Sequence, residues 1–460
     1  MQGRIGAGLV PGLYRVCAPG LRRIGKQPAG RKPGVNRAGT RLGDKNKMDV
    51  SLGTKPAAVA AIYGLAAGVI TALVFALMKG AQHVLWSAPW AQAPGYIFAV
   101  ILLGGAVLAG LQYLQEEPAR AGSAAAATQK GQVAQAAQVE QAAQVEPVGQ
   151  EEQASSAARQ RRKIVLVALS AIVAIGFGGA IGPEAGLLAV VAECAVIVSG
   201  KLAASYAQAQ SAPPAGSAQG GQQAAVAAPL AVPQWLKWLA ALLGIAGFYG
   251  ANKLFTGSQF QPLPLPGYVS SGHGADALLA LPAALAGALL GLLFVWLHHK
   301  VPAWLQVVRR PSGRILLGTA IFAALAAAFP LLRFSGHHEL EHALAHGIHA
   351  NAWTLFWLGI GKVTAMAVCL ASGWRGGEIF PVLFAGAAVA AAVHVLVPGI
   401  PLTVAVVGGM CAASTVCTGK PVAVLLVMLL LVGLNAPAAL LTGLLVGYGV
   451  RRLVWRHPQG

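Results

Sequence analysis

Two glycine-rich segments are the places where this chain could bind an ion through its backbone. The first, Gly176–Gly186, reads Gly-Phe-Gly-Gly-Ala-Ile-Gly-Pro-Glu-Ala-Gly, and the second, Ser372–Pro381, reads Ser-Gly-Trp-Arg-Gly-Gly-Glu-Ile-Phe-Pro. Glycine lets a backbone approach a ligand closely. A helix that begins at such a break points free N–H groups, and the positive end of its dipole, at whatever lies there. The two breaks therefore predict a path for an anion.

Each break also carries one glutamate: Glu184 directly follows Pro183, and Glu378 precedes Pro381. Glu184 falls in the predicted first turn of a helix, where a carboxylate stabilises free amides and complements the dipole. A gate that swings into the ion path is the second interpretation, because carboxylates inside a membrane are so often functional. It predicts that Glu184→Gln changes the pH dependence of anion flux. For Glu378 we expect an ion pair with the neighbouring Arg375.

A histidine-rich segment at 337–349 has the pattern of a different chemistry. It contains His338-Glu339-x-x-His342, in which two histidines would bind zinc and the glutamate would act as base. On a helix, His338, His342 and His346 would share one face. The bland interpretation is a polar helix facing water, and an accessory metal or pH-sensing role is a further one. A membrane-embedded zinc protease is the rival function, while the favoured interpretation needs no cofactor and no metal.

The composition places both breaks in a membrane. Of the 460 residues, 56% are hydrophobic and only 10% are charged, whereas soluble domains carry about 25% charged residues. Roughly a dozen apolar segments follow one another, several of them shorter than the ~20 residues that span a bilayer. Short segments broken by glycine and proline, recurring in both halves, are typical of transporters built from inverted repeats. We predict an all-α, polytopic membrane protein with an inverted-repeat, broken-helix architecture.

Changes in composition along the chain divide it into seven segments. Residues 1–50 are basic, with eleven Lys/Arg against Asp44 in the first 47 residues. Next to a first membrane span, this excess indicates a cytoplasmic flank rather than a nucleic-acid-binding arm; Met48 offers an alternative start to Met1. The remaining segments are first membrane helices at 51–116, low-complexity loops at 117–160 and 201–233, a first broken-helix region at 161–200, central membrane helices at 234–335, and a second broken-helix region with the C-terminal membrane helices at 336–455.

The strings at the two breaks resemble those of the chloride channel/antiporter (CLC) family. Gly179–Pro183 resembles its Gly-x-x-Gly-Pro filter segment and Gly376–Pro381 its Gly-Gly-x-Phe-x-Pro segment. The resemblance implies a homodimer in the cell membrane, with one pore per subunit for chloride or a similar small anion, and no nucleic-acid partner. It implies that backbone amides near 180–182 and 378–380 coordinate the ion. The expected filter residues are Gly179, Ala180, Ile181, Gly182 and Pro183, with Gly376, Gly377, Glu378, Ile379, Phe380 and Pro381.

The chain departs from the family pattern where proton coupling would arise. The family's gating glutamate stands two residues before the proline, and Ile181 holds that position here. The sequence shows no counterpart of the inner, proton-relaying glutamate at 253–262, of the Gly-Ser-Gly-Ile-Pro segment, or of the pore tyrosine. Passive conduction is therefore favoured over proton-coupled antiport, which is the alternative. Each lysine in an apolar run (Lys253, Lys362 and Lys420) could attract anions, although a side chain that extends to the membrane surface is the commoner case. Lys420 is the strongest candidate for conduction, because it precedes Pro421 at a helix start.

Overall fold

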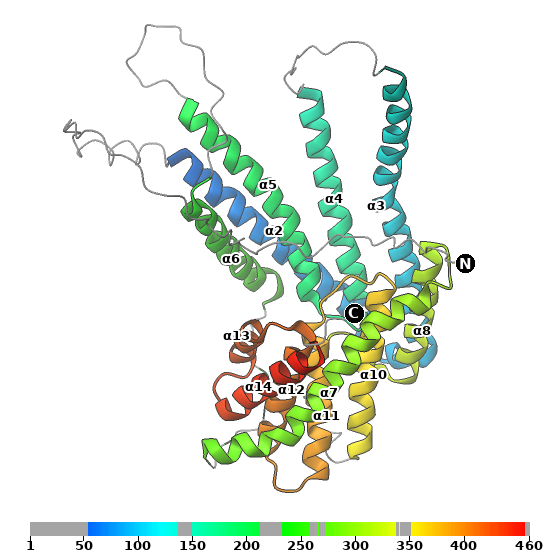
Figure 1. The fold of residues 1–460 in the computed structure, drawn as a ribbon. Helices are drawn as coiled ribbons and strands as arrows, with labels where there is room; N and C mark the ends of the chain where they lie inside the picture. The colour runs from blue at the N-terminus through cyan, green and yellow to red at the C-terminus, as the bar shows by residue number, and fades with distance from the viewer. Residues whose placement is uncertain are drawn as a thin grey trace, which may run out of the picture. The chain divides into compact units, whose positions relative to one another are not determined.

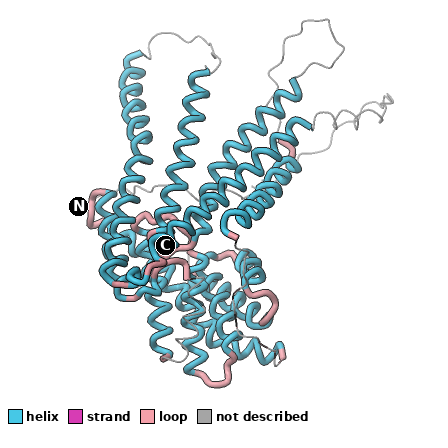
Figure 2. The backbone as a smooth tube through the Cα atoms, turned by 180° about the vertical axis from the view of Figure 1, so that it is seen from behind, coloured by secondary structure: helices cyan, strands magenta, loops and turns pink. Residues whose placement is uncertain are grey.

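A computed structural model describes the chain over residues 54–136, 150–211, 232–257, 263, 265, 268, 270, 272–336, 340 and 351–455. These residues are helical apart from turns, connecting segments and a single two-residue bridge (Figures 1 and 2). Eight of the described helices are long and apolar enough to cross a membrane. The prediction of an all-α, polytopic membrane protein is therefore confirmed.

The first break divides α4 from α5, and the second divides α10 from α11, so each half of the chain has one break. The first half contains α2 (Thr54–Trp86), η1 (Pro89–Gln92), α3 (Pro94–Ala136), α4 (Gln150–Gly176), α5 (Pro183–Ser211) and α6 (Gln234–Thr256). The second half contains α7 (His273–Leu305), α8 (Pro311–Ala328), η2 (Pro330–Leu332), α10 (Ala352–Ala371), α11 (Ile379–Leu396), α12 (Leu402–Thr418), α13 (Pro421–Leu431) and α14 (Pro437–Val454).

The two halves repeat one pattern of helix packing. In the first half α2 packs against α4, α5 and α6, and α4 also packs against α3 and α5. In the second half α7 packs against α10, α11 and α12, and α10 also packs against α8 and α11. The second half adds α13 and α14, and α14 lies against both α7 and α12 (Figure 1). The repeat predicted from the two breaks therefore extends to the neighbours of the helices around them.

Glycines allow the central helix of each half to approach its partner closely. A methyl group built on Gly68 of α2 would lie 2.0 Å from the carbonyl oxygen of Gly244 on α6. In the second half, a methyl group on Gly287 of α7 would lie 2.3 Å from the carbonyl oxygen of Gly409 on α12. Helices in lipid associate through such small-residue contacts, because burial of apolar surface no longer drives them together.

The two low-complexity segments are more helical than the sequence predicted. Within the segment 117–160, α3 continues to Ala136 and α4 begins at Gln150; within 201–233, α5 continues to Ser211. Alanine, glutamine and glutamate are strong helix formers even where they have nothing to pack against. For the first of these segments, the composition predicts either a loop or a fraying helix end. The basic segment 1–50 lies outside the described residues.

Candidate functional site

The two breaks begin with the same turn. At the end of α4, Gly178 has φ +89°, and the Gly179 N–H donates back to the Ala174 carbonyl at 3.0 Å. At the end of α10, Gly373 has φ +83°, and the Trp374 N–H donates to the Cys369 carbonyl at 3.1 Å. A left-handed glycine followed by this long backward bond is a standard helix terminator. Both helices therefore stop at a fixed residue and release the chain in the same direction relative to their axes.

Four residues after each of these glycines, the two breaks bind each other. The Gly182 N–H donates to the Gly377 carbonyl at 2.8 Å, and the Gly377 N–H donates to the Gly182 carbonyl at 2.7 Å. They form an isolated antiparallel bridge. The exchange of both bonds between equivalent residues is what a local two-fold axis produces. The bridge therefore supports an inverted arrangement of the two halves, and it occupies the Gly182 amide, which we had expected to face an ion.

Glu184 reaches across this bridge to the start of α11. Its Oε1 accepts hydrogen bonds from the Ile379 N–H at 3.1 Å and the Phe380 N–H at 3.4 Å. Its Oε2 is buried and has no hydrogen-bond partner among the described residues. Methyl groups built on Gly182 and Gly377 would lie 1.9 and 2.1 Å from the carboxylate oxygens. The carboxylate thus fills a space that only glycine leaves open, and it takes the amides at 379 and 380 that the sequence assigned to the anion.

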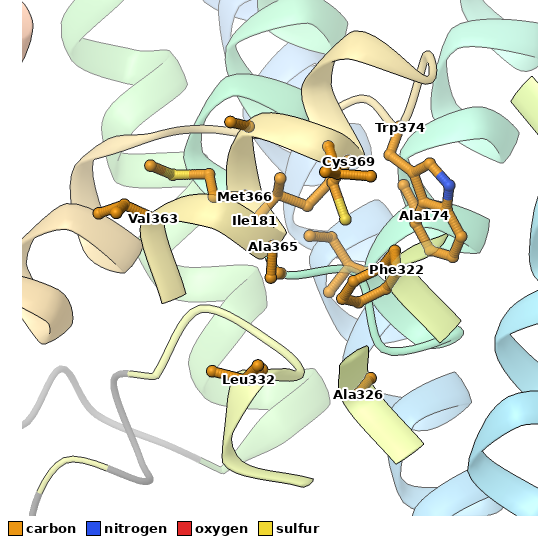
Figure 3. Packing of buried hydrophobic residues seen from close by; sticks show 14 of the residues in the cluster. Ala174, Ile181, Phe322, Ala326, Leu332, Val363, Ala365, Met366, Cys369 and Trp374 are labelled. Carbon is orange, nitrogen blue, oxygen red and sulfur yellow. The ribbon is translucent and has the colours of Figure 1, made fainter. Parts of the chain in front are cut away.

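Ile181 is a core side chain. It is 1% exposed and packs over Gly376, where an added methyl group would lie 2.5 Å from its Cδ1. Figure 3 shows it among side chains of α10, including Met366 and Cys369, with Trp374 nearby. An apolar side chain enclosed in this way holds the two breaks together. Nothing in its chemistry lets it bind or release an ion.

The expected ion pair between Glu378 and Arg375 is wrong for the described residues. Arg375 Nη2 instead donates to Gln115 Oε1 of α3 at 2.5 Å. The Glu378 carboxylate faces the Cys417 thiol and the Arg451 guanidinium, although Arg451 is distant in the sequence. The two side chains have different partners, so closeness in the sequence was a poor guide to pairing.

Lys362 is a buried cation of the second half. It is 0% exposed, and its Nζ donates to the carbonyls of Leu331, Leu332, Arg333 and Phe334 at 2.8–3.4 Å. It also lies 4.9 Å from the ring centroid of Phe384. This ammonium group fixes the turn after η2, whose Phe334 N–H donates to the Gly178 carbonyl of the first break at 3.2 Å. Lys253 and Lys420 are exposed.

A cavity of about 270 Å³ lies beside the first break, lined by Ile181 and Pro183 and by polar residues of α2. Sequence reasoning missed the α2 residues Lys79, Gln82 and His83. Their spacing, with Trp86 one turn further, places all four on one helix face. A polar stripe of this kind inside a long apolar helix was the available signal.

The zinc-protease pattern lies outside the described residues, since His338, Glu339, His342 and His346 are all in segments that the structure does not describe. Within the described residues, no group of three or more His, Cys, Asp or Glu side chains is placed to hold a metal ion. The geometry at hand therefore concerns the two breaks, where backbone amides and one carboxylate meet.

Comparison with known proteins identifies these breaks as part of a family pattern. A family model described as "Voltage gated chloride channel" matches residues 122–452. The matched range contains both breaks, Glu184 and the whole second half. It is well over half of the chain.

Two solved structures share the fold. A slow cyanobacterial Cl⁻/H⁺ antiporter aligns with a TM-score of 0.58 and 16% identity, covering 88% of this chain and 96% of that one. A CLC-type fluoride/proton antiporter aligns with a TM-score of 0.52 and 14% identity, covering 88% of this chain and 97% of that one. At these identities the likeness concerns the fold alone.

Similar curated proteins come from Escherichia. Proteins provisionally described as ion-transport proteins and called YfeO, from Escherichia coli strain IAI39 and from Escherichia fergusonii, are 31% identical over 179 residues. The match covers 38% of this chain and 41% of each relative. The aligned region thus spans about two-fifths of the length of these relatives.

Proposed function

Because the chain belongs to the voltage-gated chloride channel family, we propose that it carries small anions, chloride first, across a membrane at the junction of its two breaks. This family transports ions and is not a family of enzymes, which favours transport over the zinc-protease hypothesis. The proposed filter is formed by Gly179–Pro183 and Gly376–Pro381, with the lipid bilayer as the surrounding medium.

The observation that carries the proposal is the position of the Glu184 carboxylate. A carboxylate oxygen and a halide ion compete for the same donors, and Oε1 accepts from the Ile379 and Phe380 amides. These amides open α11, an 18-residue helix whose dipole favours negative charge at this end. Glu184 is in effect a tethered anion bound where a free anion would bind. When it leaves, the two donors become available to a transported ion.

Glu184 therefore serves as the gate in this proposal, in place of Ile181. The two hydrogen bonds that hold it are charge-assisted and contribute about 1.5–3 kcal/mol each. The unpartnered Oε2 weakens the binding of the Glu184 carboxylate to these amides, because an unsatisfied polar atom in a buried site costs about 1–3 kcal/mol. A carboxylate that is bound but incompletely satisfied can be displaced by an anion at moderate concentration. Passive conduction follows from this exchange without any proton.

Proton-coupled exchange is the second candidate, and one observation favours it. The group that leaves the amides is a carboxyl, and the second oxygen, Oε2, has no partner among the described residues. A proton that binds there would remove the charge that competes with the anion. Each Glu184 departure would then move one proton against the anion, provided that the protonated side chain reaches the other side of the membrane.

The test is reconstitution of the full chain into vesicles, with chloride efflux and proton movement recorded together. Glu184→Gln keeps the shape of the side chain and removes its negative charge. We expect wild-type protein to carry chloride in a pH-dependent manner, and Glu184→Gln to carry it with a flattened pH profile. Glu193→Gln is the matched control, since Glu193 lies on the same helix and its carboxylate pairs with Lys163 at 2.8 Å and accepts from Gln160 Nε2 at 2.9 Å rather than from the amides of α11.

Each outcome has one meaning. Chloride flux without proton movement supports the channel, and coupled proton flux supports the antiporter. An unaltered pH profile in Glu184→Gln contradicts the gate. Absence of chloride, fluoride and nitrate flux from well-folded protein would contradict anion transport itself.

We also propose a homodimer with one pore per subunit, as the family resemblance implies. Light scattering on protein in detergent should then give about twice the chain mass of 46.8 kDa, after correction for detergent. A mass of one chain would contradict the dimer and leave the pore proposal intact.

A further inference from the structure

The cavity beside the first break is larger than a bare ion needs. It measures about 270 Å³, which leaves room for several water molecules at ~30 Å³ each. One wall is the break itself, through Ile181 and Pro183, and the opposite wall is α2. Pro183 is the residue directly before Glu184 in the chain, although Glu184 itself does not line the cavity.

The wall formed by α2 is polar along one stripe. Lys79, Gln82, His83 and Trp86 are spaced i, i+3, i+4 and i+7, and all four line the cavity. Two of them fasten α2 to the end of α4: Trp86 Nε1 donates to the Gly176 carbonyl at 2.8 Å, and Gln82 Nε2 to the Ile175 carbonyl at 3.5 Å. These bonds hold the helix face, and therefore Lys79 and His83, toward the cavity.

The charged side chains among the described residues that line the cavity have one sign. Among the described residues that line it, Lys79 and His83 are basic and none is Asp or Glu. Behind Trp86 lies a second cation, since the Arg333 guanidinium sits 4.5 Å from the Trp86 ring centroid. Arg333 is buried and is held there by Gln92 Oε1, which accepts from its Nη2 at 2.8 Å. Positive charge in a concave, low-dielectric wall raises the local concentration of anions.

We propose that this cavity is an anion-binding site separate from the one at the start of α11, and that Lys79 is its main cation. Its size selects a monovalent anion that keeps much of its hydration, or a small oxyanion such as nitrate, rather than a dehydrated halide. The Lys79 ammonium supplies the charge, and the Gln82 and His83 side chains supply polar contacts at the rim. The transport test of this site rests on the proposed function, because it needs chloride flux, whereas the site itself does not need the Glu184 gate.

A transport measurement tests the role of Lys79. In Lys79→Gln, we expect the chloride concentration for half-maximal flux to rise about tenfold, the lower end of the gain that charged clefts give, while the maximal flux stays within twofold. Lys201→Gln is the matched control, because Lys201 is an exposed lysine of α5 that does not line the cavity. An unchanged half-saturation value in Lys79→Gln would overturn the proposal.

A labelling experiment tests the same site without relying on transport. In a background with Cys17→Ser and Cys417→Ser, because Cys417 is partly exposed, His83→Cys would place a thiol at the cavity, while the native Cys194, Cys369 and Cys411 are buried. We expect the anionic reagent sulfonatoethyl methanethiosulfonate to modify this thiol about tenfold faster than its trimethylammonioethyl counterpart. Nitrate should slow the reaction, Lys79→Gln should abolish the preference, and Lys201→Gln should retain it.

Labelling at equal rates by both reagents would overturn the site. The charge preference is read by mass spectrometry, so it is independent of whether the protein conducts. If Glu184→Gln leaves the pH profile unaltered while the preference persists, the gate fails and the cavity site stands.

Discussion

The two halves of this protein share one packing pattern but differ in how far that pattern is enclosed. The apolar stretch of α11 is 67% buried, whereas that of its counterpart α5 is 17% buried. The same holds one helix later: α12 is buried almost along its whole length, while only 6% of the apolar stretch of α6 is buried. The second half has α13 and α14 to cover it, and the first half has no described equivalent. The amides at the start of α11 are therefore held by an enclosed helix. The helix that faces them across the bridge, α5, is covered by far fewer neighbours.

The same comparison shows that the glutamates at the two breaks are not at equivalent positions. Gly182 and Gly377 are equivalent across the bridge, so each residue of the first break matches the residue 195 positions later. Glu184 then matches Ile379, and Glu378 matches Pro183. Only the start of α5 therefore has a carboxylate, Glu184, that reaches the opposite helix start across the local two-fold axis. The repeat supplies two similar helix starts, and the sequence places a carboxylate against only one of them.

The largest effect is expected when the space around that carboxylate is closed. Gly182→Ala and Gly377→Ala each place a methyl group within 2.1 Å of a Glu184 carboxylate oxygen, in the volume that an anion would also use. Because the methyl group closes this space to the ion as well, the anion loses the two charge-assisted hydrogen bonds that it would make there, of about 1.5–3 kcal/mol each. At 1.4 kcal/mol per tenfold, this predicts a fall in chloride flux of about 100-fold or more. Vesicle flux assays measure it.

Folding should survive both changes, because the atoms that must move belong to a flexible side chain. Gly110→Ala is the control, since nothing lies within 4 Å of the added methyl group. Equal loss in the two variants would support the local two-fold axis. Flux retained in either one would show that anions do not use the space next to Glu184.

The glycine breaks, the carboxylate and the membrane class could be predicted from the sequence, because each depends on local chemistry. The bridge between Gly182 and Gly377 could not, since it joins residues far apart in the chain and depends on how both halves fold. The repeated glycines at 178 and 182, and at 373 and 377, held a usable signal. Aligning the breaks on those glycines, rather than on their prolines, would have shown that Glu184 faces Ile379.

The positions of the charges show the limit of such reasoning. Lys362 lies within an apolar run, where the sequence suggested an anion attractant or a side chain that extends to the membrane surface. The structure turns it inward onto four carbonyls, a partner set that composition does not reveal. Arg375 similarly pairs with Gln115 of the other half. Long polar side chains choose partners in space, and neighbours in the sequence predict those partners poorly.

The next largest effect is expected at the buried Lys362, which has no equivalent in the first half. By the same register its counterpart on α4 is Val167, a buried apolar residue. Lys362→Met leaves the four carbonyls without their shared donor. Because a buried carbonyl left unsatisfied costs about 1–3 kcal/mol, we expect a loss of about 3 kcal/mol or more in the free energy of unfolding. Thermal unfolding in detergent measures it.

Lys420→Met is the control, because Lys420 is exposed and should change stability by less than about 0.5 kcal/mol. Equal stability of Lys362→Met and wild type would mean that the turn after η2 holds without the ammonium group. The second half would then not be the more rigid of the two halves.

A smaller difference is expected between the glycine contacts of the two halves. Gly287→Ala forces α7 away from α12, which α11 and α14 enclose on other sides. Overpacking of a closed interior costs about 1–3 kcal/mol. Gly68→Ala pushes α2 from α6, which is largely uncovered and can yield toward lipid, so it should cost less than half as much. Parallel thermal unfolding of the two variants compares them, and a greater loss in Gly68→Ala would contradict the difference in enclosure.

The smallest effect is expected at the Ser414 hydroxyl of the second half, where stability and chloride flux can be measured separately. Ser414 Oγ is buried without a hydrogen-bond partner among the described residues, and Ser414 lines a small cavity that also touches Ile379. In the first half, buried Ser170 has its hydroxyl satisfied, accepting from Gln115 Nε2 at 2.9 Å and donating to the Leu166 carbonyl at 2.7 Å. Ser170→Ala should therefore cost about 1 kcal/mol in unfolding free energy, whereas Ser414→Ala should cost nothing, because it removes an unpaired polar group.

Chloride flux recorded on the same two preparations should be unchanged. A tenfold fall confined to Ser414→Ala would mean that the hydroxyl binds the moving anion, and the path would then continue from Glu184 along the more enclosed half.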